Sequence, residues 1–237
     1  MTATPTRSAA LHLKLDLAAP ALNAAMAELW RPAGLVERYG RYLRTMHEVI
    51  RASVPLMELA ARRCVERGPA DPVAGPLARY LERHIEEERG HDDWLLADLA
   101  AAGLDPAEPL RRQPPPAVAR LVGPQYYWIE HFHPVSLLGY ITVLEGNAPA
   151  PWLAARLAAD TGLPGAAFQT VNHHAVLDCD HSAELDRFLD GLPLDRAQET
   201  AVAVSALHTA DAATELFARL ARGGPPLPSR PERTPDR

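Results

Sequence analysis

The sequence has little of what nucleic-acid binding or membrane insertion requires. Lys14 is the only lysine, and the 24 basic residues are outnumbered by 30 acidic residues and form no cluster. Nucleic-acid binding needs cationic groups that displace counterions, so we expect no such partner. No apolar run approaches the ~20 residues that span a bilayer. The N-terminus also lacks the basic end and apolar core of a secretory signal. These absences predict a cytoplasmic protein without a membrane partner.

Cysteine is also scarce. Cys64 and Cys179 lie far apart in the sequence, and neither belongs to a CxxC or CxxH group. This spacing is typical neither of a structural zinc site nor of a disulfide framework. We expect two buried thiols in a reducing compartment.

The 237 residues show no strand-like alternation of useful length. Apolar residues instead recur every three or four positions between Pro and Gly breaks, which predicts an all-α protein of amphipathic helices. We expect one helical domain over 21–222, a flexible segment over 1–20 and a disordered Pro-rich tail over 223–237. The first expected helix covers 35–66, with a kink at Pro55, and the second begins at 72 or 76 and ends at 103. A third helical region follows the prolines at 114–116 and runs to 145, with an interruption at Pro134. The last three expected helices cover 152–160, 165–189 and 195–222.

The second of these helices places two imidazoles and a carboxylate on one face. At 3.6 residues per turn, His84, Glu88 and His91 fall within an arc of about 60°, and Leu81 and Leu95 lie beside them. An unpaired buried carboxylate is costly. A metal ion removes that cost because it binds neutral imidazole and ionised carboxylate together. A single helical His–Glu pair, taken alone, is more often a surface salt bridge.

The fifth helix repeats the arrangement. His174, Asp178 and His181 have the same spacing and are flanked by apolar residues such as Val171 and Leu185. Spacings of four and three bring donor atoms from successive turns close together. This HxxxDxxH pattern is the stronger of the two signals for a metal site.

A third helix adds a lone acid, because Glu145 follows Leu138 and Ile141 in an otherwise apolar stretch. Nitrogen and oxygen ligands without thiolate suit iron or manganese. The number of candidate ligands exceeds what one metal ion needs, so the sequence predicts two metal ions. The predicted ligands are His84, Glu88, His91, Glu145, His174, Asp178 and His181.

The sequence also contains the ligand pattern of an alternative metal site. Glu88 with His91 and Glu130 with His133 form two ExxH pairs, as in ferritin-like di-iron bundles. Pro134 directly follows the second pair and must bend or end that helix. This alternative also leaves the HxxxDxxH residues without a function.

The order of these motifs resembles the heme-oxygenase-like di-iron oxidases and oxygenases. The run HIEEERGHDDWLLADL is similar to the iron-containing redox enzymes of that superfamily. The resemblance implies one bundle of about seven helices around a central metal and substrate cavity. It also implies two Fe(II) ions, with Glu145 as the shared carboxylate, and O2 as co-substrate. The implied reaction oxidises a small organic substrate, such as an amino acid or fatty acid derivative. An electron donor and a homodimer are compatible with this resemblance.

The early carboxylate departs from the family pattern. One turn before His91 stands Glu88, but two turns before it stands His84. This leaves open whether His84 or Glu87 binds metal. As substrate-contacting residues we expect His47, which shares a helix face with apolar residues, and Tyr140, which lies near Glu145.

Three other functions compete with a di-iron enzyme. The first is heme binding or degradation on the same fold, with His47 or His12 as the proximal ligand. The second is a cofactor-free helical enzyme of the thiaminase or quinone-cofactor-synthesis type. The third is a non-catalytic metal-binding protein. The first two leave the HxxxDxxH pattern unexplained.

Overall fold

The computed structural model describes residues 5–223, apart from the side chains of residues 178–180. Within these residues every regular element is a helix, which confirms the all-α prediction. The longer helices are α1 (Arg7–Leu29), α2 (Leu35–Ile50), α3 (Ser53–Arg67), α4 (Ala74–Glu88), α5 (His91–Ala101), α7 (Pro116–His131), α8 (Leu137–Glu145), α9 (Leu153–Thr161), α10 (Gln169–Gly191) and α11 (Arg196–Arg222). The short ones are η1 (Gly68–Ala70), α6 (Glu108–Arg111), η2 (Pro134–Ser136) and η3 (Gly165–Phe168).

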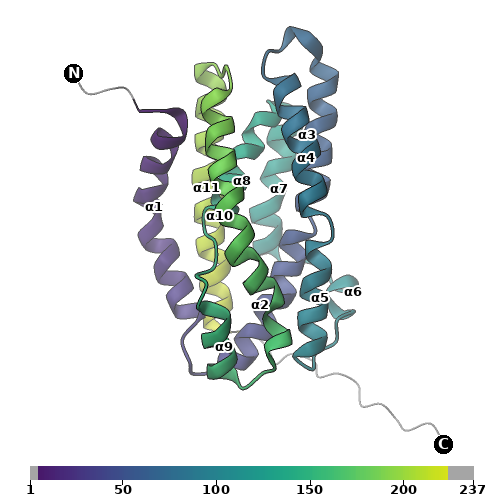
Figure 1. The fold of residues 1–237 in the computed structure, drawn as a ribbon, viewed down its shortest axis with the longest axis vertical. Coiled ribbons are helices and arrows are strands. Elements are labelled where there is room, and N and C mark those ends of the chain that lie inside the picture. The colour runs from purple at the N-terminus through teal and green to yellow at the C-terminus, as the bar shows by residue number, and fades with distance from the viewer. Residues whose placement is uncertain (1–4, 224–237) are drawn as a thin grey trace, which may run out of the picture.

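The long helices run side by side in a bundle (Figure 1). The C-terminal helix α11 packs against α1, α7 and α8, while α3 packs against α4 and α7. The buried apolar side chains of these helices form one core. No helix of the described part of the chain is long and apolar enough to cross a membrane.

The first predicted helix is broken rather than kinked. α2 ends at Ile50 and α3 begins at Ser53, so Pro55 lies in the first turn of α3. Proline is tolerated there because the first N–H groups of a helix have no intrahelical partner. The chain therefore restarts the helix two residues before the proline.

The second predicted helix is also two helices. α4 ends at Glu88, Arg89 is extended, and Gly90 takes a left-handed conformation with φ of 86° before α5 begins at His91. Glycine adopts this conformation at little cost. The break falls between Glu88 and His91, so these two residues belong to different helices.

The N-terminal segment expected to be flexible is helical from Arg7 onward. Leu11 is buried, His12 lies 2.8 Å from Asp186 and Arg7 lies 2.7 Å from Glu199, so α1 is tied to α10 and α11. Tertiary packing therefore orders residues 7–20. The tail from residue 224 onward lies outside the described residues.

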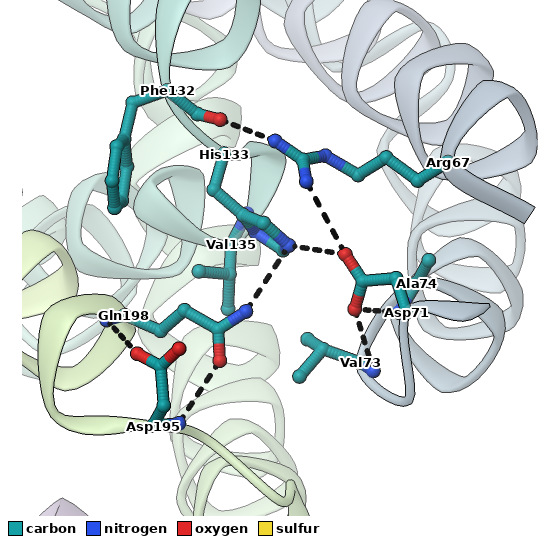
Figure 2. Close-up of polar contacts among 9 residues, drawn as sticks. All are labelled: Arg67, Asp71, Val73, Ala74, Phe132, His133, Val135, Asp195 and Gln198. Carbon is teal, nitrogen blue, oxygen red and sulfur yellow. Dashed lines mark hydrogen bonds and ion pairs between the residues drawn. The ribbon is translucent and has the colours of Figure 1, made fainter.

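A buried histidine joins two parts of the bundle and lies beside a third (Figure 2). His133 Nδ1 accepts a hydrogen bond from the Val135 N–H at 3.0 Å, so Nε2 carries the proton and donates to Asp71 Oδ2 at 2.8 Å. The other Asp71 oxygen accepts from the Val73 N–H at 2.9 Å. The Gln198 amide nitrogen of α11 lies 3.3 Å from His133 Nε2, which has no lone pair left to accept a hydrogen bond from it. The hydrogen bonds of His133 therefore hold the α3–α4 connection against η2.

We expect this network to weaken in mild acid. Burial lowers the pKa of His133 below its usual 6.5, with Asp71 opposing the shift. A histidine whose folded pKa is lowered contributes stability that is complete above about pH 6.5 and is lost as the pH falls below it. Replacing His133 with Asn should cost about 1–3 kcal/mol of unfolding free energy at pH 7.5. The difference between wild type and variant should shrink at pH 5.5, as measured by urea denaturation. A constant difference would contradict this account.

Candidate metal centre

Four predicted ligands meet between three helices. His84 and Glu88 come from α4, Glu145 ends α8 and His181 lies in α10. Each offers one donor atom, and these atoms all lie within 4.8 Å of one another. All four side chains are buried or nearly so. The sequence places them up to 97 residues apart (181 − 84), so only the bundle brings them together.

His84 lies between two carboxylates. Its Nε2 is 2.6 Å from Glu145 Oε1 and its Nδ1 is 3.2 Å from Glu87 Oε2. Burial alone would lower the pKa of His84, but hydrogen bonding to Glu145 and the nearby charge of Glu88 raise this pKa to about 9. Without metal, His84 is therefore an imidazolium at neutral pH.

The two oxygens of Glu88 face different imidazoles. Oε2 lies 3.3 Å from His91 Nδ1, and Oε1 lies 3.9 Å from His181 Nδ1. Glu88 thus stands between two groups of donors. Burial alone would raise the pKa of Glu88, but the adjacent His91 imidazole lowers it. The carboxylate is accordingly ionised at neutral pH.

On the far side of Glu88, His91 and His174 face each other. Their ring centroids are 5.3 Å apart, and Trp94 stacks on His91 at 4.0 Å. The Nδ1 of His174 lies 2.9 Å from the Thr170 carbonyl oxygen. A carbonyl only accepts, so Nδ1 carries the proton and Nε2 keeps its lone pair. Burial lowers the pKa of His174, which favours this neutral, metal-ligating form.

Three buried polar atoms of the predicted ligands lack hydrogen-bond partners among the described residues. They are His91 Nδ1, His181 Nδ1 and Glu145 Oε2. His181 Nδ1 is 3.9 Å from both Glu88 and Glu145, which is too long for a hydrogen bond. Buried donors and acceptors left unpaired are costly. A cation coordinated between these groups would satisfy them, so the donor set fits a metal.

A partly open cavity of about 160 Å³ borders this cluster. His84, Glu88, Glu145 and His174 line one part of it, and most of the remaining lining is apolar, including side chains of α1, α2, α8 and α11. No lysine or arginine of the described chain lines it. Its walls thus suit an apolar ligand better than a charged one.

Of the two residues predicted to contact the substrate, one lines the cavity and the other does not. Tyr140 lines the cavity, is 2% exposed, and its hydroxyl has no hydrogen-bond partner among the described residues. His47 does not line it and instead lies buried on another side of α2, whose neighbouring Met46 and Val49 reach the cavity. This cavity thus gives no contact for His47, and its role as a substrate contact stays a prediction.

Two further predictions concern particular ligands. The side chain of Asp178 lies outside the described residues. Glu87, the alternative to Glu88, lies 3.2 Å from His84 and 3.7 Å from His181 but is 37% exposed. It therefore borders the cluster from the solvent side.

The ferritin-like alternative is not supported by the structure. His133 is committed to Asp71 and Val135, and Glu130 pairs with Arg63. Neither belongs to the donor cluster. His12, considered as a heme ligand, is paired with Asp186 and does not line the cavity.

Solved structures share this architecture. A domain of unknown function with a heme oxygenase-like fold from Shewanella denitrificans superposes with a TM-score of 0.74 at 16% identity, over 88% of this chain and 90% of that one. A TenA homolog from Pseudomonas syringae pv. tomato gives a TM-score of 0.70 at 14% identity, over 94% and 98% of the two chains. The predicted heme oxygenase-like fold is thus confirmed.

A match to a family model identifies the class of protein. Residues 64–214 match the family model of the iron-containing redox enzymes, and the chain belongs to that family. The matched stretch contains every predicted metal ligand. A search of the curated proteins finds no match.

Proposed function

We propose that this protein is a non-heme di-iron oxidase or oxygenase that uses O2 to oxidise a small organic substrate. The observation that carries the proposal is the buried His and carboxylate cluster at one part of an apolar cavity. Family membership supports iron as the metal. Two ferrous ions bound there would supply electrons for the activation of O2.

The donors divide around Glu88, which we propose as the shared carboxylate in place of Glu145. His91 and His174 would serve one ion through the side of Glu88 Oε2. His181, Glu145 and His84 would serve the other through the side of Glu88 Oε1. Asp178 belongs to the same ligand set by its position in the HxxxDxxH pattern.

The cavity walls bear on the substrate. A free amino acid carries two opposite charges at neutral pH, and the lining offers no lysine or arginine for its carboxylate. Burying an unpaired charge is costly. A substrate with an apolar chain, as in a fatty acid derivative, fits better. The unpaired Tyr140 hydroxyl would hydrogen-bond a polar group of that substrate.

Anaerobic titration of the metal-free protein with Fe(II), followed by rapid mixing with O2, tests the proposal. We expect binding of about two ions per chain and a transient visible absorption band that His174→Ala abolishes. O2 consumption by the loaded protein should accelerate with uncharged medium-chain fatty acid esters and not with free amino acids. A folded protein that binds no Fe(II) would overturn the metal assignment. Acceleration by amino acids alone would overturn the substrate assignment.

A further inference from the structure

Three residues of α5 share one face and point toward α10. His91, Trp94 and Asp98 are separated by three and four positions, so they lie on successive turns of one side of the helix. His91 lies 5.3 Å from His174 between ring centroids, and Trp94 lies 5.8 Å from the same ring. Asp98 reaches the beginning of α10. This face of α5 therefore contacts α10 along two turns.

Asp98, which belongs to α5, caps the N-terminus of α10. Its carboxylate oxygens accept hydrogen bonds from the Gln169 N–H at 3.1 Å and the Thr170 N–H at 3.0 Å. α10 begins after Phe168, which provides no side-chain cap. The first N–H groups of a helix need such acceptors. Asp98 is 0% exposed, so water does not compete for these bonds.

The same turn orients a metal ligand. Thr170, whose N–H is held by Asp98, offers its carbonyl to His174 Nδ1 at 2.9 Å. That hydrogen bond fixes the tautomer and the ring direction of His174. Partners of this kind commonly tune metal affinity as strongly as some ligands do.

We infer that Asp98 is a positioning residue of the metal centre: it anchors the first turn of α10 and, through the Thr170 carbonyl, directs His174 Nε2 toward the metal. This inference rests on the proposed function for the identity of the metal. It assigns no contact between Asp98 and either ion.

The chain offers a matched control for the test. Asp195 also caps a helix, accepting from the Gln198 N–H at 2.8 Å at the start of α11, but α11 carries no predicted ligand. Loss of either cap should lower the midpoint of urea denaturation. Only loss of Asp98 should also disturb the metal centre.

The experiment compares Asp98→Ala, Asp98→Asn and Asp195→Ala by anaerobic titration with Fe(II) alone and with Co(II) alone. We expect Asp98→Ala to weaken binding by about 10- to 100-fold and to change the Co(II) absorption spectrum. Asp98→Asn keeps one acceptor but turns an NH2 toward the other N–H, so its affinity should lie between those of Asp98→Ala and the wild type. Asp195→Ala should bind both ions like the wild type. Equal weakening by Asp195→Ala, or wild-type affinity and spectrum in Asp98→Ala, would overturn the inference.

A second readout separates this inference from the proposed function. Nitrogen NMR of the metal-free protein reports which ring nitrogen of His174 carries the proton. We expect Nδ1 in the wild type and a mixture of tautomers in Asp98→Ala. If the wild type binds neither ion, the proposed function fails, and the tautomer of His174 still decides the positioning by Asp98. An unchanged tautomer in Asp98→Ala would refute it.

Discussion

Replacing Glu88 by alanine is expected to abolish measurable Fe(II) binding, with a loss of at least about 100-fold in affinity. The reason is its central place: one oxygen faces His91 and the other faces His181. Removing it takes a ligand from both ions and removes one of the negative charges that balance the metal. Anaerobic calorimetric titration with Fe(II) measures the effect.

The control for this variant is Glu86→Ala in the same helix. Glu86 is exposed and pairs with Arg89 at 3.1 Å, away from the cluster. It removes the same chemical group and should leave Fe(II) affinity unchanged. Circular dichroism should show that both variants keep their helices. Retained Fe(II) binding in folded Glu88→Ala protein would contradict the assignment of Glu88 as the shared ligand.

Replacing Gly139 by alanine should be the most destabilising single methyl addition in the bundle core. A Cβ at Gly139 would lie 2.2 Å from the Val202 carbonyl oxygen and 2.7 Å from the Ala206 nitrogen. Both atoms belong to the α11 backbone, which cannot turn aside as a flexible side chain can. We expect a loss of about 3 kcal/mol in unfolding free energy. α8 also carries Glu145, so the displaced helix should weaken Fe(II) binding too.

The matched variant is Gly123→Ala in α7. Apart from its chain neighbours and its own helix backbone, no atom lies within 4 Å of a Cβ built there, and its φ is not positive. Alanine favours helix over glycine by about 1 kcal/mol, but Pro124 disfavours helix at a preceding residue with a Cβ, so this variant should stay within about 1 kcal/mol of the wild type. Urea denaturation measures both free energies. Equal stabilities for the two variants would show that α8 does not pack on α11 as described.

Much of the site could be predicted because helical spacing determines which residues share a face. The pattern of His84 and Glu88 within one helix, and of His174 and His181 within another, survives in the structure. Glu145 stood out because a single acid in an apolar helix needs a partner. No pairwise distance between helices could be predicted, since these distances depend on how the helices pack.

The misses have physical causes as well. The left-handed Gly90 was not expected because one glycine within a helical pattern is usually tolerated. α1 was missed because its apolar residues lie on several sides: Leu11 is buried, while Leu17 is 85% exposed. Its helix depends on packing against α11 rather than on an amphipathic pattern. The sequence did contain a signal for Asp98. It is an acidic residue seven positions after the predicted ligand His91 and therefore lies on the same helix face.

The most direct test of the account is an anomalous-scattering experiment at the iron edge on crystals loaded anaerobically with Fe(II). We predict two iron peaks flanking the Glu88 carboxylate. One should lie against His91 and His174, and the other among His181, Glu145 and His84. A single peak elsewhere on the molecule, or no iron at this cluster, would contradict the claim that these residues form a di-iron centre.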